Sequence, residues 1–262
     1  MAKPFKYDLD QRLVGAAFVR DSRASDILLT LGADSRLTDA GSLRFAAEIG
    51  HAECVRLLIA AVDSNADALA WPLASAAGNG HVECVKLLLP GSDASAKKAA
   101  LHQAVGSSQA ECVRLLIPAT NPADDNSAAL LLAAELGRDE CVKLLIPASR
   151  PKAKNSQALR GAIENGHAEC ARLLIPVSHP LLQNKQLLTA VLKSGGARIL
   201  SHMLASEPRL LDGQNLFRLQ AVASAKGHFE LARLLSSIAE QKGLAALLRV
   251  PKSGNPPCVS RL

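Results

Sequence analysis

The feature that most constrains this chain is a short motif that returns at an almost fixed interval. The motif is Glu-Cys-Val-Arg-Leu-Leu or a near copy of it, and the steps between its cysteines are 30, 28, 29 and 29 residues. A weaker echo places an apolar residue at the same position twice more. A fixed period of this size predicts a stack of small repeated units, not one closed globule. The positions that define the register are Cys54, Cys84, Cys112, Cys141, Cys170, Ile199 and Leu231.

The composition fits a helical stack. The chain has 262 residues and is 48% hydrophobic but only 3% aromatic, which favours tight packing between helices over a β-sandwich. No stretch approaches the roughly 20 apolar residues of a membrane span, so we expect no membrane association. Residues 1–140 hold 13 basic and 18 acidic side chains, whereas residues 141–262 hold 17 basic and 6 acidic ones. The basic C-terminal half favours a partner with an acidic surface.

Residues 155–176 show how one unit is built. Asn155 and Ser156 are of the types that cap helix N-termini, and apolar residues at helical spacing follow them. Gly166 supplies the left-handed turn that ends a helix, and Pro176 stops the helix after it. The unit is therefore helix, turn, helix and loop.

The second helix of this unit has a solvent side and a buried side. Glu169 and Arg172, at i and i+3, are predicted to pair on the solvent side. Both leucines of the motif are predicted to be buried, so Leu115 and Leu144 in two other repeats should belong to the core. The predicted buried side consists of Cys170, Ala171, Leu173 and Leu174.

The repeat resembles the ankyrin repeat. Leu-x-x-Ala-Ala-x-x-Gly-His occurs at 43–51 and at 73–81, Trp71-Pro72-Leu73 retains the Pro-Leu of the family's Thr-Pro-Leu-His signature, and 28–34 reads Leu-Leu-Thr-Leu-Gly-Ala-Asp. The resemblance implies an all-α solenoid of about eight helix-turn-helix repeats. Because the central units are shorter than the family period of about 33 residues, we expect shortened or absent β-hairpins. Outer helices are expected near residues 22–31, 52–60, 82–89, 110–117, 139–146, 168–175, 197–205 and 228–237.

The array is predicted to occupy most of the chain. Residues 1–10 form an N-terminal segment without a signal peptide, residues 11–237 the ankyrin-repeat array, and residues 238–262 a C-terminal cap helix and an extended basic tail. The expected location is the cytoplasm, or a host cell if the protein is a delivered effector. In a eukaryote the terminal Ser260-Arg261-Leu262 resembles the peroxisomal signal Ser-Lys-Leu.

The cysteines and histidines are predicted to be structural. Equivalent residues of neighbouring repeats should lie about 8–10 Å apart, and a disulfide needs Cα atoms closer than about 7 Å. The five register cysteines should therefore be buried and unpaired, and Cys258 in the tail should be the accessible thiol. Three histidines precede a cysteine by three residues, but each repeat offers only two ligands and zinc needs four. The resemblance implies that these histidines hold the turn between the helices; they are His51, His81 and His167.

The sequence offers no sign of catalysis. No glycine-rich phosphate loop follows a predicted strand and no Gly-x-Ser-x-Gly elbow occurs. Five copies of a catalytic cysteine would serve no reaction. We therefore expect a non-enzymatic protein with no cofactor, no metal and no catalytic residue.

A binding surface is expected where the repeats differ, because the recurring positions build the stack. The resemblance implies that another protein binds a concave groove lined by the inner helices, where apolar anchors among polar residues are typical of hot spots. The alternative for Phe18 and Phe45 is that they only fill space between those helices. We expect a monomer that acts as an adaptor, an effector or an inhibitor of a partner enzyme. The candidate groove residues are Phe18, Phe45, Glu48, Ile49, Trp71, Asn79, Gln103, Leu132, Glu135, Leu136, Glu164, Asn165 and Lys193.

The alternative function is nucleic-acid or polyanion binding through the basic C-terminal half. Arg150, Lys152 and Lys154 cluster in one predicted loop, and such a basic patch suits phosphates. Readers of single strands also stack bases on aromatic side chains. Beyond residue 141 the aromatic residues are Phe217 and Phe229, so a protein partner is the main hypothesis.

Overall fold

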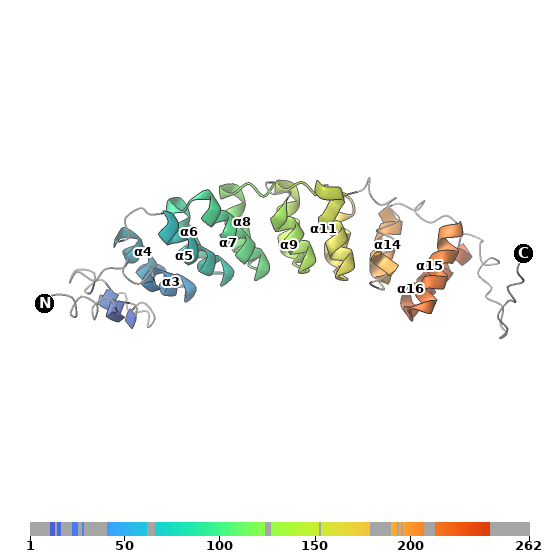
Figure 1. The fold of residues 1–262 in the computed structure, drawn as a ribbon, viewed down its shortest axis with the longest axis horizontal. Helices are drawn as coiled ribbons and strands as arrows, with labels where there is room; N and C mark the ends of the chain where they lie inside the picture. The colour runs from blue at the N-terminus through green and yellow to red at the C-terminus, as the bar shows by residue number, and fades with distance from the viewer. Residues whose placement is uncertain are drawn as a thin grey trace, which may run out of the picture. The chain divides into compact units, whose positions relative to one another are not determined.

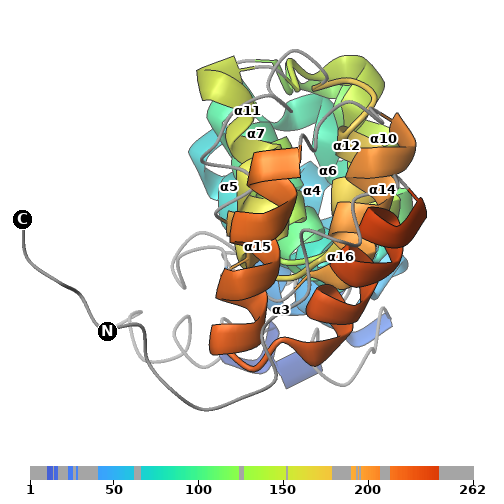
Figure 2. The ribbon, with the colours of Figure 1, turned by 90° about the vertical axis from the view of Figure 1, so that its right-hand side faces the viewer.

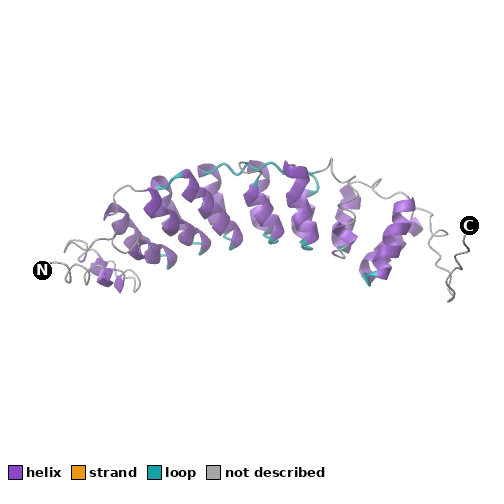
Figure 3. Ribbon diagram, in the orientation of Figure 1, coloured by secondary structure: helices purple, strands orange, loops and turns teal. Residues whose placement is uncertain are grey.

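The computed structural model describes residues 11–13, 15–16, 23–25, 28, 41–61, 66–123, 127–151, 153–178, 190–192, 194, 196–206 and 213–241. Within these residues the regular structure is helical, and no strand occurs (Figure 3). None of the helices described has the length and apolar content needed to cross a bilayer. The chain divides into two compact units, residues 1–181 and 182–262, and each is described by itself.

The first unit is a stack of helix pairs, each made of an inner and an outer helix. Inner helices contact the next inner helix along the chain, and outer helices contact the next outer helix, which gives two layers (Figures 1 and 2). The inner helices are α3 (Gly41–Glu48), α5 (Ala66–Gly78), α7 (Ala94–Gly106), α9 (Ala128–Glu135) and α11 (Ala153–Glu164). The outer helices are α4 (Ala52–Ala61), α6 (Val82–Leu88), α8 (Ala110–Leu116), α10 (Asp139–Leu145) and α12 (Ala168–Leu174).

The second unit contains one further pair and one helix that contacts it. The pair is α15 (Gly213–Ala225) and α16 (Phe229–Gln241), and α14 (Ala197–Ser206) contacts α16. The outer helices predicted between residues 52 and 237 are therefore found, each within one residue at both ends except that α16 continues to Gln241. Most of the outer helix predicted for residues 22–31 lies outside the described residues.

The core is built from positions that recur in every repeat. On α8, Cys112, Val113 and Leu116 are each 0% exposed, whereas Leu115 is partly exposed, as is Leu144 on α10. The prediction that both leucines of the motif belong to the core is therefore wrong. With 3.6 residues per turn, the buried positions i, i+1 and i+4 centre on one direction and i+3 points roughly 105° away from it. The first leucine consequently lies at the edge of the buried side.

Prolines set the ends of several helices. α11 begins at Ala153, directly after the loop that contains Pro151, so Asn155 and Ser156 lie inside the helix and the prediction that they cap it is wrong. A side-chain cap is present on α7, where a carboxylate oxygen of Asp93 accepts a 2.6 Å hydrogen bond from the Ala96 amide. The Pro two residues after each of α6, α8 and α10 lies in a single 3₁₀ turn; these turns are η1 (Leu89–Gly91), η2 (Ile117–Ala119) and η4 (Ile146–Ala148).

The turns between paired helices connect neighbouring repeats. The residue with positive φ in these turns is a glycine at Gly50, Gly80, Gly137 and Gly166, and a serine, Ser108, between α7 and α8. Glycine suits such a position because it has no Cβ to clash.

The side chain after this residue reaches back to the preceding repeat. His81 Nε2 lies 2.9 Å from the Glu48 carbonyl oxygen, and His167 Nε2 lies 2.9 Å from that of Glu135. The histidines thus join two repeats, which is more than the turn-holding role that the resemblance implies.

Candidate binding surface on the inner helices

The inner helices carry three rows of side chains that differ from repeat to repeat. The rows are the positions two, five and six residues after the buried leucines Leu43, Leu73, Leu101, Leu130 and Leu159, and we call them the inner-face rows. The first row is Phe45, Ser75, Gln103, Leu132 and Gly161; the second is Glu48, Gly78, Gly106, Glu135 and Glu164; the third is Ile49, Asn79, Ser107, Leu136 and Asn165. The described groove candidates all belong to these rows except Trp71, which precedes Leu73 by two residues.

Large exposed apolar side chains of the first unit gather on the inner helices. Among its described residues, Trp71 is 68% exposed, Leu136 is 42% exposed and Phe45 is 37% exposed. Phe45 lies on α3, Trp71 on α5, and Leu136 directly follows α9. These side chains can supply apolar contact area to a partner.

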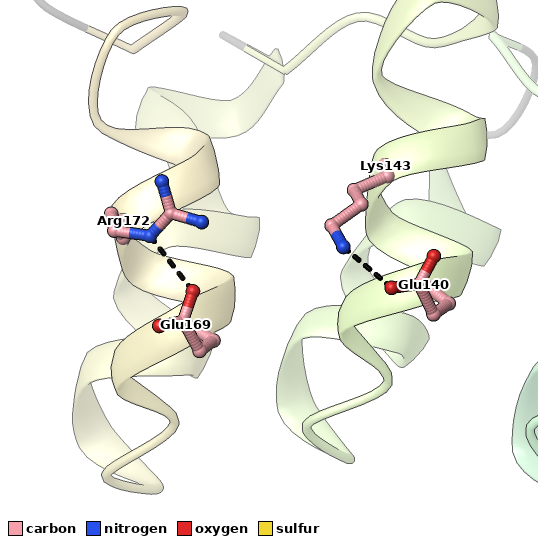
Figure 4. Close-up of polar contacts among 4 residues, drawn as sticks. All are labelled: Glu140, Lys143, Glu169 and Arg172. Carbon is pink, nitrogen blue, oxygen red and sulfur yellow. Dashed lines mark hydrogen bonds and ion pairs between the residues drawn. The ribbon is translucent and has the colours of Figure 1, made fainter.

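The outer helices present a different surface, made of ion pairs within each helix. The predicted pair Glu169–Arg172 is confirmed at 2.8 Å and is matched by Glu140–Lys143 on α10 (Figure 4). Exposed pairs of this kind contribute little to stability, and they keep the outer face polar. The remaining pairs are Glu53–Arg56, Glu83–Lys86 and Glu111–Arg114.

Helices α3 and α5 bring several predicted residues together around one arginine. The Arg44 guanidinium lies 5.5 Å from the centre of the Trp71 ring and 4.0 Å from the Glu48 carboxylate. Asn79 Nδ2 donates a 3.2 Å hydrogen bond to the Glu48 carbonyl oxygen. Sequence reasoning missed Arg44, although its position four residues before Glu48 was a usable signal.

A second group of predicted residues comes together on α9 and α11. A Cβ at Gly161 would lie 2.7 Å from Glu135 Cγ, so the two helices pack closely at this point. Asn165 Nδ2 donates a 2.9 Å hydrogen bond to the Gly161 carbonyl oxygen. The side chains of Glu135, Leu136 and Glu164 are exposed, so this group combines an apolar side chain with two carboxylates.

Other predicted positions fall outside these groups. Phe18, Lys193 and the side chains of Lys152 and Lys154 lie outside the described residues. Arg150 is exposed and lines a hollow of about 440 Å³ whose other walls are Ile146, Pro147, Pro151 and Val177. The apolar walls of this hollow do not resemble a phosphate site, which needs converging donors.

The register cysteines are buried thiols outside any disulfide, as predicted. Burial raises the pKa of Cys84 and of Cys170 to about 11, so these thiols stay protonated and unreactive at neutral pH. Cys54 Sγ lies 3.5 Å from the hydroxyl of Ser25, which is 29 residues earlier. Within the described part of the chain, no group of three or more His, Cys, Asp and Glu side chains could hold a metal ion.

Sequence reasoning also missed a cavity of about 550 Å³ between α7 and α9. It arises because α7 begins seven residues before its buried leucine and α9 only two residues before its own, so α9 lacks the corresponding first turns. Its polar lining consists of Ser95, Lys98, His102, Thr120 and Asn121. Burial, and then the nearby Lys98 charge, lower the pKa of His102, which favours the neutral imidazole.

Comparisons with known proteins agree with this geometry. A family model described as "Ankyrin repeats (3 copies)" matches residues 13–98, 73–156 and 101–186, which together are more than half of the chain. The crystal structure of the human ASB11 ankyrin repeat domain is similar, with a TM-score of 0.60 and 23% sequence identity over 72% of this chain and 96% of that chain. At this identity the likeness concerns the fold. No curated protein matches the chain.

Proposed function

This chain belongs to the ankyrin-repeat family, and on that premise we propose that it is a non-catalytic module that binds a partner protein on its inner-face rows. Ankyrin-repeat arrays are generally protein–protein interaction modules and are typically not enzymes. An interface of standard size would bury about 1,600 Å² in total. The module would act as an adaptor, an effector or an inhibitor that occludes a partner enzyme. We propose the cytoplasm as its location, where buried thiols stay reduced.

The observation that carries this proposal is the contrast between the two layers of the first unit. The exposed large apolar side chains Phe45, Trp71 and Leu136 belong to the inner layer, while the outer helices carry ion pairs such as Glu53–Arg56. Protein interfaces are rich in aromatic residues and poor in charged residues at their centre. The inner layer therefore has the composition of an interface, and the outer layer does not.

The test is a pull-down from native lysate followed by binding of the purified partner. A double variant, Phe45→Ala with Trp71→Ala, should lose the partner while its melting temperature changes little, because Trp71 is 68% exposed. The matched control is Glu53→Gln with Arg56→Gln on the outer helix α4, which should retain the partner. If both variants retained the partner, or if the Phe45→Ala, Trp71→Ala variant were much less stable than the wild type, the assignment of these residues to the binding surface would be contradicted.

A nucleic-acid function through the basic half remains the second candidate because of one observation in the second unit. Phe229, the first residue of α16, is 78% exposed. Arg233 is exposed one helical turn after it, and Lys226 is exposed in the turn that precedes the helix. An exposed ring beside cations is suited to stacking on an unpaired base. Binding of single-stranded RNA or DNA that falls steeply with salt and is lost in Phe229→Ala would favour this function over the inner-face proposal.

A further inference from the structure

The inner-face rows of the first unit carry charge of one sign. Of the fifteen positions in α3 to α11 and the residues that follow these helices, three are glutamates, Glu48, Glu135 and Glu164, and none is basic. All three glutamate side chains are exposed. The excess of basic residues beyond residue 141 therefore does not describe this surface.

The surface has an α3 end and an end that begins at α9 and continues to α11, and each end combines carboxylate and exposed apolar groups. At the α3 end, Glu48 has Phe45 one turn before it and Ile49 beside it. At the α9 end, Glu135 stands between Leu132 and Leu136, which is 42% exposed. A partner that covers both ends needs cations opposite the carboxylates and apolar side chains opposite the apolar groups.

In the middle of the surface, on α5 and α7, no side chain projects from the second row, because the residues there are glycines. Gly78 and Gly106 occupy the row that holds glutamate on α3, α9 and α11. A Cβ at Gly78 would meet nothing closer than 3.7 Å, and one at Gly106 would have no neighbour within 4 Å. Neither glycine is among the residues with positive φ, so neither packing within the chain nor backbone conformation requires them. Both glycines are the last residue of their helix, where the space shown would accept an alanine, so the fold alone does not explain the choice.

The spacing of the two ends sets the length of the bound segment. Neighbouring packed helices lie about 8–10 Å apart, and α9 is the third inner helix after α3. The two ends are therefore separated by roughly 24–30 Å, which is the length of a helix of about 16–20 residues.

We propose that the inner-face rows of the first unit bind a segment of a partner protein that is both basic and apolar, with its backbone passing close to Gly78 and Gly106. This inference rests on the proposed function and adds the chemistry of the partner. Apolar side chains of the segment contact Phe45, Trp71 and Leu136. Its lysines or arginines pair with Glu135 and Glu164, because the Glu48 carboxylate already lies 4.0 Å from Arg44.

The experiment uses a displayed library of peptides, about 20 residues long to match the estimated span, in which Lys, Arg, Asp, Glu, Gln and large apolar residues are equally frequent. Peptides selected on the full chain are synthesised, and their dissociation constants are measured at low and moderate salt. The variants are Glu135→Gln with Glu164→Gln, Gly106→Glu, Gly106→Ala and Trp71→Ala. Glu83→Gln on the outer helix α6 is the matched control for loss of a carboxylate.

The expected result is enrichment of Lys and Arg over Asp and Glu. Loss of each inner-face carboxylate should weaken binding about two- to five-fold at low salt, and Glu83→Gln should have no effect. Gly106→Glu should weaken binding about ten-fold or more, because the loss from blocked close approach exceeds the gain of at most about five-fold from one more exposed carboxylate. Gly106→Ala should leave the melting temperature unchanged or higher, which separates a binding effect from a folding effect.

Two outcomes contradict the inference in different ways. Selected peptides that are acidic or neutral and bind the Trp71→Ala variant more weakly would contradict the inference that the bound segment is basic. They would still support binding on the inner-face rows. Selected peptides whose affinity is unchanged in both Trp71→Ala and Gly106→Glu would overturn the inference and the proposed function together.

Discussion

Replacing Gly137 with alanine would test the contact that joins two repeats. Gly137 has φ of +69°, a left-handed conformation that costs a residue with a Cβ roughly 1–2 kcal/mol. The new Cβ would also overlap the imidazole of His167, whose Nε2 lies 2.9 Å from the Glu135 carbonyl oxygen. Displacing the ring gives up a hydrogen bond that contributes about 1 kcal/mol. We therefore expect Gly137→Ala to lower the free energy of unfolding by about 2–3 kcal/mol.

A double-mutant cycle in urea, followed by circular dichroism, separates the two contributions. In a His167→Ala background the new Cβ has no imidazole to overlap, so Gly137→Ala should lower the free energy of unfolding only by the backbone penalty. The coupling free energy between the two sites should therefore be about 1 kcal/mol. Gly166→Ala is the matched control, because Gly166 has φ of +75° and a Cβ there meets nothing within 4 Å. If Gly137→Ala and Gly166→Ala lowered the free energy of unfolding equally and Gly137 showed no coupling to His167, the assigned contact between the two repeats would be refuted.

Three further outcomes are expected from the core, a turn and a buried thiol. Leu116→Ala should cost about 2–5 kcal/mol and Leu115→Ala clearly less, because only Leu116 is fully buried; equal costs in urea unfolding would contradict the assigned helix face. Ser108→Gly should raise the free energy of unfolding by about 1 kcal/mol, because serine there has φ of +62° and glycine adopts that conformation without a steric penalty. The pKa of Cys84 is raised from 9.0 to about 11, so the folded state holds its proton longer than the unfolded chain and stability should fall as pH rises from about 9 to 11. Cys84→Ala should make that alkaline loss shallower, and an unchanged pH dependence would show that this thiol is not its source.

The sequence predicted the repeats well because their register is a local, periodic property. The motif spacing located the outer helices, since the residue types that fill a helix–helix interface recur at fixed steps. It misjudged Leu115 because two adjacent leucines look alike in sequence, and only the direction of the helix relative to its neighbours decides which one is buried. It misjudged the start of α11 because Asn155 and Ser156 are good caps that the helix does not use when it can begin earlier, after Pro151.

The candidate surface was predicted in outline for the same reason, and its details depended on contacts between repeats. The inner-face rows follow from counting from Leu43 and its equivalents. The position of Arg44 over Trp71 depends on how α3 and α5 stack, and the cavity beside His102 depends on where α9 starts relative to α7. Neither property is encoded in a single repeat, so neither could be read from one.

The turn between α7 and α8 shows how fold and surface requirements separate within a repeat. In the other described turns between paired helices of the first unit the residue with positive φ is glycine. Here it is Ser108, and a glycine stands two residues earlier at Gly106, where φ is not positive. Selection for stability alone would favour glycine at the first position, where it relieves strain, and does not require it at the second, which is the last residue of α7. A local choice that opposes the fold is expected where the surface has another task. The position of Gly106 in the row that carries glutamate on α3, α9 and α11 makes close approach of a partner the task that fits.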